Sequence, residues 1–568
     1  MTKLTIPIVA DSALRQRKRE APKGRRVDPA ALAELRSLLG DAPMQRDLLI
    51  EHLHKIQDAF GHLSAAHLAA LAQVMRLAQT EVFEVASFYH HFDIVKDGEP
   101  APPRLTVRVC DGLPCTLAGA HALLAGLPGL LGDGVRVIAA PCVGRCEQAP
   151  AVVVGQNAVA PALADSVVAA VLAGQTRHAS QAGPGHIGFA AYRAAGGYAL
   201  YQACASGARD AESIIATLEH AGLRGLGGAG FPAGRKWRIV RAEAGPRLMA
   251  VNIDEGEPGT FKDRVLLERD PHRFIEGLLI AAWAVGIEQV YIDLRDEYHG
   301  CRELLSAELG LLQRALPAGQ LPTLHLRRGA GAYICGEESA MIESIEGKRG
   351  LPRLRPPYVA QVGLFGRPTL AHNFETLYWV RELIEKGGAW FAAQGRHGRQ
   401  GLRSFSISGR VKQAGVKLAP AGITVQELID EHCGGMQDGH VLYAYLPGGA
   451  SGGILPASLN NIPLDFDTLQ PYGCFIGSAA VIVLSDHDSA VAAARNMLHF
   501  FKNESCGQCT PCRNGTAKAS ALIDQVRWDL PLLADLSQVM REASICGLGQ
   551  AAPNPIDCVV KYFPQELA

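Results

Sequence analysis

The sequence predicts an α/β protein built from several domains, because three observations coincide. The chain has 568 residues, which is enough for two to four domains. Two long stretches, at about 105–175 and 205–395, alternate strand-like and helix-like patterns. A strand-rich stretch at about 402–475 separates them from a helical C-terminal segment, and the first hundred residues are also helical in pattern.

Net charge and the length of the apolar runs give no sign of nucleic-acid binding or of a membrane span. Hydrophobic residues make up 48% and charged residues 20%, an ordinary globular balance. The net charge of −1 gives no electrostatic reason to expect nucleic acid as a partner. The apolar runs near Gly277–Gly286 and Ala479–Leu484 are shorter than the roughly 20 residues of a membrane span, and Ile6–Ala10 is too short for a signal peptide. We therefore expect no membrane span and a cytoplasmic protein.

The first hundred residues divide into an arm and a helical segment. Residues 1–26 are basic and lack periodicity, which predicts a flexible arm that is more often solvated than docked. From Asp28 to about Phe92, apolar residues recur at helical spacing. Ser64 and Thr80 are expected to cap two of these helices.

A small α/β unit is expected after Pro102 and Pro103. Its predicted strands are Leu105–Cys110, Val135–Ala139 and Ala151–Val154, with a helix at Ala118–Ala125. The stretch Gly174–Gly197 is rich in Gly, Ala and Ser and predicts a linker.

The rest of the chain is expected to alternate, then turn to strands, then to helices. Predicted strands in the alternating part are Arg247–Val251, Gln289–Asp293 and Thr323–Leu326. The strand-rich part is expected to contain Arg403–Ser408, Val441–Leu446 and Cys474–Gly477, with one helix at Ile423–Asp430. After Asp486 the pattern is helical to the end.

Eight of the 14 cysteines fall into two tight groups, which in a cytosolic chain indicates metal rather than disulfides. In the first group, Cys110 and Cys115 are spaced C-x4-C, and Cys142 and Cys146 are spaced C-x3-C. Four thiolates on loops at the ends of adjacent elements suit a 2Fe–2S cluster. Zinc is the competing metal, although zinc sites more often use C-x2-C.

In the second group, Cys506, Cys509 and Cys512 are spaced C-x2-C-x2-C, which wraps one side of a 4Fe–4S cube. Cys546, in a glycine-rich turn, is the favoured fourth ligand. Cys558 is the alternative, but its apolar surroundings (CVVKYF) favour a core position. For the remaining thiols buried positions are expected by default: Cys204, Cys301, Cys335, Cys433 and Cys474.

Three further segments carry the signs of a nucleotide site. Residues 222–237 (GLRGLGGAGFPAGRKW) combine glycines, which let backbone amides approach a phosphate, with Arg235 and Lys236. Residues 252–264 (NIDEGEPGTFKDR) place acids after a predicted strand, where α/β folds bind ligands. Residues 328–346 (RGAGAYICGEESAMIESIE) lead from a glycine loop into a helix. Taken singly, each is as well explained by a turn or a solvated loop.

Two family resemblances follow from these motifs. The pattern CDGLPC…PCVGRC and the preceding helical stretch (DLLIEHLHKIQDAFGHLSAAHLAALAQ…EVFEVASFYHHF) resemble the thioredoxin-like 2Fe–2S subunit of NADH dehydrogenases, the 24-kDa type. The three glycine and acid segments, continued by KRGLPRLRPPYVAQVGLFGRPT and NFET, resemble the FMN- and NADH-binding 51-kDa-type subunit over about 350 residues. The chain thus looks like two such subunits fused.

The resemblance implies cofactors and site residues. It implies FMN, NAD(H), one 2Fe–2S cluster and one 4Fe–4S cluster, the latter on the four cysteines favoured above. Glu257 and Glu338 would orient cofactors, with no catalytic side chain because the flavin carries the chemistry. Leu226, His372 and Tyr358 depart from the usual family residues. The implied FMN residues are Gly225, Gly227, Gly228, Gly230, Asn252, Asp254, Glu255, Gly336, Glu337, Glu338 and Asn373, and the implied NADH residues are Phe231, Lys236, Glu257, Glu338, Arg355 and Tyr358.

The expected fold class is α/β multidomain, with boundaries drawn from the pattern and the resemblance together. The expected domains are a flexible basic arm (1–26), a helical domain (27–100), a thioredoxin-like 2Fe–2S domain (101–180), a Rossmann-like FMN- and NADH-binding domain (190–395), a small β-grasp-like domain for soluble ligands (400–482) and a helical 4Fe–4S domain (483–568).

Fused chains of this kind resemble subunits of two enzymes: the β subunit of molybdenum- or tungsten-dependent, NAD-linked formate dehydrogenase, and the diaphorase subunit of NAD-reducing hydrogenase. The segments QRDLLIEHLH and YLPGGASGGILPASLNNIPLDF favour the first. The chain has no molybdopterin or nickel motif, so a catalytic α subunit is expected as its partner. A hypothesis of another class is a zinc-binding assembly protein without redox turnover, which would be colourless rather than brown.

Overall fold

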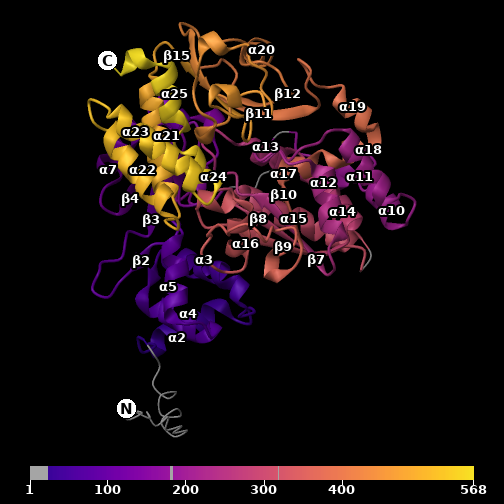
Figure 1. Cartoon of the computed structure of the whole chain (residues 1–568). Helices are drawn as coiled ribbons and strands as arrows, with labels where there is room; N and C mark the ends of the chain where they lie inside the picture. Colours follow the sequence, from indigo (N-terminus) through magenta and orange to yellow (C-terminus); the bar gives the residue numbers. More distant parts are fainter. Residues whose placement is uncertain (1–23, 179–182, 184, 317–318, 568) are drawn as a thin grey trace, which may run out of the picture.

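The computed structural model describes residues 24–178, 183, 185–316 and 319–567. Most of the predicted arm at 1–26 therefore lies outside the described residues. Figure 1 shows the chain as successive units, with the N-terminal helices at the bottom and the C-terminal helices beside the strand-rich unit. Within the described ranges, no helix is long and apolar enough to cross a membrane.

The N-terminal helices form a unit that docks on the larger α/β unit. His54 and the carbonyl oxygen of Gly329 are 2.8 Å apart, and Arg328 pairs with Asp58 at 2.6 Å. Both contacts involve the end of strand β9, Thr323–Arg328, and the residue after it. The bounds are α2 Pro29–Leu39, α3 Leu49–Phe60, β1 Leu63–Ser64, α4 Ala65–Met75, α5 Gln79–Phe88 and β2 Ile94–Val95.

One of the two predicted helix caps is confirmed and the other is wrong. Ser64 caps α4, and its hydroxyl accepts a bond from the His67 amide at 3.0 Å. Thr80 instead lies inside the first turn of α5. The Glu81 carboxylate takes the capping role there, since it accepts from the Ala78 amide at 3.1 Å.

The small α/β unit has a four-stranded sheet in the order β4-β3-β5-β6. Strand β3 is parallel to β4 and antiparallel to β5, so the loops after β3 and β4 meet at one edge of the sheet. Both predicted cysteine loops follow these two strands. The bounds are β3 Leu105–Cys110, α6 Leu113–Leu117, α7 Ala120–Leu131, β4 Val135–Ala140, β5 Val152–Val154, β6 Asn157–Val159 and α8 Ala164–Leu172.

The predicted linker at 174–197 is not structureless throughout. Helix α9, Phe189–Ala194, lies within it, and the buried Tyr192 hydroxyl donates to Glu276 at 2.7 Å. Burial of this tyrosine against α14 explains why a Gly- and Ala-rich segment still forms a helix. Residues 179–182 and 184 lie outside the described residues.

The larger α/β unit is built on a parallel sheet in the order β10-β7-β8-β9. Alternate residues of β7 enter two different cores: Met249 and Val251 pack with α14, whereas Leu248 and Ala250 pack with Met341 of α16. The sheet is therefore covered on both faces, and its carboxyl edge is left for a site. The helices before and around the sheet are α10 Ala199–Ala205, α11 Ala211–His220, α12 Ala233–Ala242, α13 Lys262–Arg269, α14 Pro271–Val285, α15 His299–Ala315, α16 Glu338–Ile345, α17 Phe374–Tyr378, α18 Val380–Lys386 and α19 Gly388–Ala392, and the strands are β7 Arg247–Ile253, β8 Ile287–Leu294, β9 Thr323–Arg328 and β10 Thr369–Asn373.

The strand-rich unit has a mixed sheet in the order β12-β11-β15-β13-β14. The predicted strand at Cys474–Gly477 is wrong. Gly473 and Gly477 take φ of 79° and 50°, which breaks the extended backbone at both ends of that segment. The strand lies just beyond, at Ala480–Ser485, where every residue is buried. The bounds are β11 Leu402–Gly409, β12 Gly415–Pro420, α20 Val425–Glu427, β13 Leu442–Leu446, β14 Leu455–Pro456 and β15 Ala480–Ser485.

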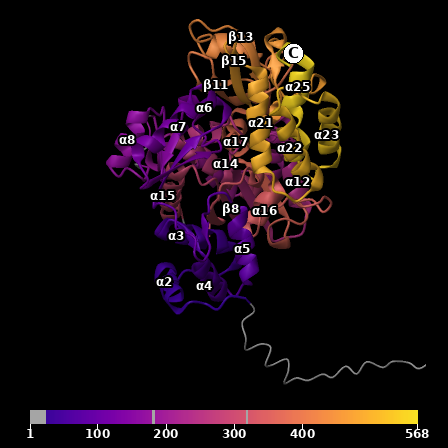
Figure 2. The ribbon, with the colours of Figure 1, turned by 90° about the vertical axis from the view of Figure 1, so that its left-hand side faces the viewer.

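The C-terminal helices pack against the small α/β unit and the strand-rich unit. Figure 2 shows α21 running between the small α/β unit and the rest of the helical bundle. The Asn496 side chain donates to the carbonyl of Asp111 at 2.8 Å, and the Tyr562 hydroxyl donates to the carbonyl of Tyr472 at 2.9 Å. The bounds are α21 Ala490–Glu504, α22 Thr510–Ile523, α23 Leu530–Ala543, α24 Gly547–Ala551 and α25 Asn554–Tyr562.

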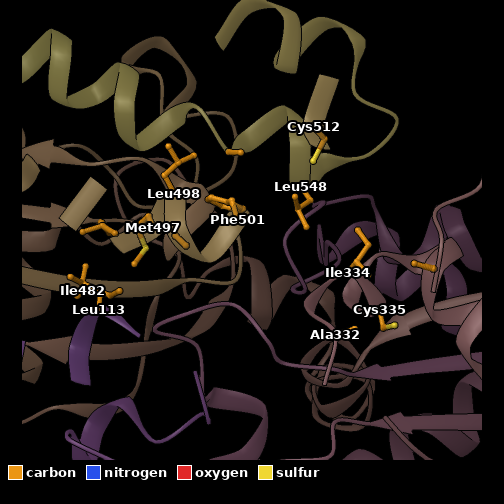
Figure 3. Packing of buried hydrophobic residues seen from close by; sticks show 14 of the residues in the cluster. Leu113, Ala332, Ile334, Cys335, Ile482, Met497, Leu498, Phe501, Cys512 and Leu548 are labelled. Atoms are coloured by element: carbon orange, nitrogen blue, oxygen red, sulfur yellow. The ribbon is translucent and has the colours of Figure 1, made fainter. Parts of the chain in front are cut away.

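One apolar core crosses the boundaries between these units. It joins Leu113 of the small α/β unit, Ile482 of β15, Phe501 of α21, Leu548 of α24 and Ile334 of the larger α/β unit. Figure 3 shows these side chains on differently coloured parts of the ribbon. The shared core fixes the relative positions of the segments that carry the cysteines and the glycine loops.

Candidate functional site

A cavity of about 330 Å³ lies at the carboxyl edge of the parallel sheet, and three units form its wall. The larger α/β unit supplies most of the lining. The strand-rich unit adds Ser451, Phe475, Gly477 and Ser478, and helix α24 adds Gly547, Leu548 and Ala551. Of the residues implied by the resemblance, it is lined by Gly227, Gly228, Asn252, Asp254, Glu255, Glu257, Gly336, Glu337 and Asn373.

The end of β7 presents a carboxyl group with free hydrogen-bonding capacity. The Asn252 side chain accepts from the Asp254 amide at 2.8 Å and donates to the carbonyl of Gly336 at 2.8 Å. Burial raises the pKa of Asp254 well above its ordinary value. Its Oδ2 is buried and has no hydrogen-bond partner among the described residues. An orphaned buried acceptor is costly, so this atom fits a polar group of a bound ligand.

A buried lysine lies on the same wall. Lys262 pairs with Asp263 at 2.6 Å and with Glu375 at 3.2 Å. Burial works against its charge, but the two carboxylates raise the pKa of Lys262 above its ordinary value. Asn373 donates to the other oxygen of Asp263 at 2.8 Å, which holds this network in place. A fixed cation beside a glycine-lined wall suits a phosphate.

Glu257 connects three units of the chain at the cavity. Its Oε1 accepts from the amide and the hydroxyl of Ser451, at 2.7 and 2.8 Å. Its Oε2 accepts from the hydroxyl of Tyr333, whose amide in turn donates to Glu504 of α21 at 2.9 Å. Burial raises the pKa of Glu257, and the bonds from Tyr333 and Ser451 oppose that rise. The carboxylate is thereby held in one orientation.

Several implied residues lie outside the cavity lining, but some form an ion-pair chain that leads to it. Lys236 is 3.4 Å from Glu338, which is 3.2 Å from Arg355, and Arg355 also pairs with the cavity residue Glu337. Tyr358 is 56% exposed and so can offer a ring face to a ligand outside the cavity. Also outside the lining are Gly225, Gly230 and the exposed Phe231.

Two acids and one histidine have structural partners that sequence reasoning did not foresee. Glu255 accepts from the amides of Asp263 and Arg264, at 2.8 and 3.2 Å. Glu337 caps α16, accepting from the amides of Ser339 and Ala340. His372 accepts from the indole of Trp237 at 2.6 Å, and burial lowers the pKa of His372 to about 3. His372, which departs from the family pattern, is therefore a neutral ring packed in the core.

The first cysteine group converges in the small α/β unit. Cys110, Cys115, Cys142 and Cys146 are all buried. The sulfurs of Cys142 and Cys146 are 3.4 Å apart, and Cys110 lies within hydrogen-bonding reach of both Cys115 and Cys142. Four buried and convergent thiols suit a cluster that replaces their protons with metal.

One arginine joins this cysteine group to the nucleotide cavity. Arg295, just after the end of β8, is 5% exposed. Its guanidinium donates to the carbonyl of Cys142 at 2.6 Å and to the carbonyl of Glu255. Its charge favours the Cys142 thiolate, although the neighbouring thiols contribute most to the lowered pKa of Cys142. Arg295, which also pairs with Glu297 at 3.1 Å, thus places a buried guanidinium between the cavity wall and the cysteine loop.

The second cysteine group sits beside the cavity. Cys506, Cys509 and Cys512 precede and begin α22, and Cys546 precedes α24, whose residues line the cavity. Burial raises the pKa of Cys512 to about 11 and that of Cys546 to about 12. The amides of Leu548 and Gly549 point at the Cys546 sulfur and favour its thiolate. Cys558 lies elsewhere, next to Cys474, so it does not join this group.

A further set of metal-type donors carries no such assignment. His54, His91 and Asp296 bring their donor atoms within 4.8 Å of one another, beside a larger cavity of about 710 Å³. The Asp296 carboxylate already pairs with Arg328 at 2.6 Å and lies 3.5 Å from Arg302. These cations disfavour another positive charge there, and the group serves to join the N-terminal helices to the end of β8.

Sequence reasoning missed the cavity residues supplied by other units. No local pattern marks Ser451, Phe475, Gly477 and Ser478 as site residues, because only the folded sheet brings them to the cavity. Lys262 and Tyr333 could have been found, since both lie inside the glycine and acid segments. A lysine beside an acid in a strand-to-helix turn was the available signal.

Family models match four parts of the chain. They are described as Thioredoxin-like [2Fe-2S] ferredoxin (residues 35–175), Nuo51 FMN-binding domain (218–382), SLBB domain (404–455) and NADH-ubiquinone oxidoreductase-F iron-sulfur binding region (492–568). The four matches cover the small α/β unit with its helices, the larger α/β unit, the strand-rich unit and the C-terminal helices in turn.

Individual proteins are similar over long stretches. The NADH-quinone oxidoreductase F 2 subunit of Rhizobium meliloti is 41% identical over 396 residues, covering 67% of this chain and 94% of that protein. NADH dehydrogenase [ubiquinone] flavoprotein 1 of Dictyostelium discoideum is 40% identical over 372 residues, covering 62% and 78%. A solved chain of an NAD+-reducing [NiFe]-hydrogenase in the H2-reduced state superposes with a TM-score of 0.80 at 33% identity, covering 92% of both chains.

Proposed function

Because the chain belongs to the family of FMN-binding, 51-kDa-type subunits of NADH dehydrogenases, we propose that it is the NADH-handling β subunit of a molybdenum or tungsten formate dehydrogenase. Membership of this family establishes the general activity. The chain is an NADH-oxidising flavin and iron–sulfur subunit of a larger oxidoreductase. The identity of the catalytic partner is the proposal.

The chain carries FMN, NAD(H), one 2Fe–2S cluster and one 4Fe–4S cluster. FMN supplies the exchange of two electrons with NADH and of single electrons with the clusters. The donor sets fit these groups: an orphaned carboxyl and a fixed lysine in the cavity, and two convergent sets of thiols. The same features argue against a zinc-binding assembly protein, which would not need the cavity.

We assign roles to the residues that hold these groups. Asn252, Asp254, Lys262 and Asn373, with the glycine loop, hold FMN, and Glu257 orients the nicotinamide nucleotide from the opposite wall. Lys236, Glu338, Arg355, Phe231 and Tyr358 extend the nucleotide site outward from the cavity. Cys110, Cys115, Cys142 and Cys146 hold the 2Fe–2S cluster, and Cys506, Cys509, Cys512 and Cys546 hold the 4Fe–4S cluster.

Formate dehydrogenase is favoured as the partner by the sequence segments at the start of the helical unit and around Ser451. Since the chain has no molybdopterin motif, formate chemistry would lie on an α subunit that exchanges electrons with the 4Fe–4S cluster. We place this complex in the cytoplasm, because cysteines grouped for iron rather than disulfides are typical of a reducing compartment.

Co-purification tests the partner. Tagged chain isolated from its native cells is expected to bring down a protein containing molybdenum or tungsten, and the complex is expected to reduce NAD+ with formate. The isolated chain is expected to be brown and to bleach with NADH. If the partner contains nickel, and the complex reduces NAD+ with hydrogen but not with formate, the assignment changes from formate dehydrogenase to hydrogenase.

The hydrogenase alternative rests on a specific observation. The solved hydrogenase chain is similar over 92% of its own length, which includes the fused arrangement of units. The same experiment therefore measures hydrogen and formate as reductants side by side, with metal analysis of the co-purified protein.

The bridging arginine leads to a prediction about the 2Fe–2S cluster. Reduction adds negative charge to the cluster, and a buried cation nearby stabilises that charge. Arg295→Met is therefore expected to lower the 2Fe–2S midpoint potential, on the order of 60 mV, or tenfold for one electron. A redox titration followed by paramagnetic resonance measures this, with the 4Fe–4S signal as internal reference. Arg295→Lys keeps the charge and should stay near the parent value; an equal shift in both variants would contradict an electrostatic role.

A further inference from the structure

Two cysteines outside the cluster groups meet where the strand-rich unit packs on the C-terminal helices. Cys474 precedes β15 and Cys558 lies in α25, and their sulfurs are 3.6 Å apart. Both are buried, at 1% and 2% exposure. Their separation of 84 residues gave no spacing signal in the sequence.

The two thiols are in direct contact, and either one can donate a hydrogen bond to the other. The Cys558 thiol also donates to the carbonyl oxygen of Gly473 at 3.9 Å. The contact with Cys474 lowers the pKa of Cys558, and the nearby Asp557 opposes that shift. A cavity of about 360 Å³ opens beside them and is lined by both cysteines together with Lys561 and the ion pair of Arg541 with Asp557. Two thiols in contact, with a cavity that reaches both of them, have the arrangement that formation of a disulfide requires.

The pair is packed directly behind the nucleotide site. A Cβ added to Gly453 would lie 2.6 Å from the sulfur of Cys474 and 3.0 Å from that of Cys558. Two residues earlier, Ser451 donates twice to Glu257. The Asn554 side chain, from the same helix as Cys558, donates to the carbonyl of Ser451 at 3.0 Å. The segment 451–453 thus connects the sulfurs to the cavity wall.

We propose that Cys474 and Cys558 are a peroxide-reactive dithiol whose oxidation to a disulfide weakens the use of NADH. The Cys558 sulfur attacks one oxygen of hydrogen peroxide, the O–O bond breaks, and a sulfenic acid and water form. The Cys474 sulfur then attacks the Cys558 sulfur, the S–S bond forms, and a second water leaves. Two thiols and one peroxide give one disulfide and two waters.

The effect on NADH follows from the packing. An S–S bond is about 2.05 Å long, so the sulfurs must approach by about 1.5 Å from their present separation. Gly453 packs so closely on both sulfurs that there is no room even for a Cβ, so their approach is expected to displace Gly453 and, with it, Ser451 relative to Glu257. The expected effect on NADH use rests on the proposed role of Glu257, whereas formation of the disulfide does not.

The test uses the full chain with its flavin and clusters, treated anaerobically with equimolar hydrogen peroxide and quenched with catalase. After alkylation, peptide mass spectrometry without reductant should find residues 474 and 558 cross-linked, with two hydrogens lost. The KM for NADH is expected to rise about tenfold, equivalent to about 1.4 kcal/mol, and dithiothreitol should restore it. Flavin and iron contents are expected to be unchanged.

Matched variants separate the possible outcomes. Cys558→Ser is expected to give no cross-link and no rise in KM, while Cys433→Ser, another buried thiol of the strand-rich unit, should behave like the parent chain. Peroxide oxidation without a 474–558 cross-link overturns the site. A cross-link with unchanged KM overturns the coupling. If Glu257→Gln also leaves the KM for NADH unchanged, the proposed role of Glu257 in binding NADH is wrong. The mass spectrum still shows in that case whether Cys474 and Cys558 form a disulfide.

Discussion

Replacing Cys546 with serine is expected to abolish electron exchange with the catalytic partner while sparing FMN. Serine is a far weaker iron ligand than a cysteine thiolate, so the 4Fe–4S cluster loses one of its four protein ligands. Cys546 lies outside the cavity lining, although α24 after it contributes Leu548 to that wall. NADH oxidation with a dye that takes electrons directly from flavin should therefore survive, and turnover coupled to formate should fall to background.

Five measurements test this prediction: iron content, the 4Fe–4S paramagnetic signal, flavin absorbance and the two activities. Cys204→Ser is the matched control, since Cys204 is a fully buried thiol of α10 that packs in a different apolar core from both cysteine groups. It should retain both activities. Coupled turnover that persists without the 4Fe–4S signal would mean that electrons leave by another route, with the 2Fe–2S cluster as the candidate.

Replacing Glu257 with glutamine is expected to raise the KM for NADH by about 10- to 100-fold, with FMN still bound. Three donors, from Ser451 and Tyr333, converge on this carboxylate. A hydrogen bond to a charged group contributes about 1.5–3 kcal/mol, and an amide turns one acceptor into a donor. The FMN-holding residues Asn252 and Lys262 keep their own partners, so flavin retention is expected.

Steady-state kinetics with a dye acceptor, together with flavin content, measure the effect of Glu257→Gln. Glu288→Gln, at the exposed start of β8, is a control that removes one carboxylate from the same unit. Lys236→Ala is expected to act in the same direction as Glu257→Gln, because Lys236 begins the ion-pair chain toward the cavity. Loss of FMN from both Glu257→Gln and Lys236→Ala would show that these two residues hold FMN and were wrongly assigned to NADH.

Local chemistry made much of the fold predictable. Strand β3 ends where the alternating pattern LTVRVC ends, and the parallel strands β7, β8 and β9 follow their apolar runs. The fold class, including the strand-rich and C-terminal helical units, is confirmed by the family models. The cofactor set is confirmed in the same way, since each cofactor is indicated by short motifs whose residues are close in sequence.

Long-range contacts set the limit of sequence reasoning. Strand β12 pairs antiparallel with β11 but follows a polar turn with little alternation, and it was not predicted. The same reason hid Ser451, whose place at Glu257 is decided by the packing of β13 to β15 rather than by its neighbours. The contact of Cys474 with Cys558 depends on how α25 lies against the strand-rich unit.

The cavity wall that three units share has a consequence for synthesis. Gly227 and Leu548 face the same cavity from positions 321 residues apart. A nascent chain that has not yet left the ribosome beyond α24 has one side of the flavin pocket missing. A chain that ends before α24 is therefore expected to hold FMN less tightly, while the cysteines of the small α/β unit are still present.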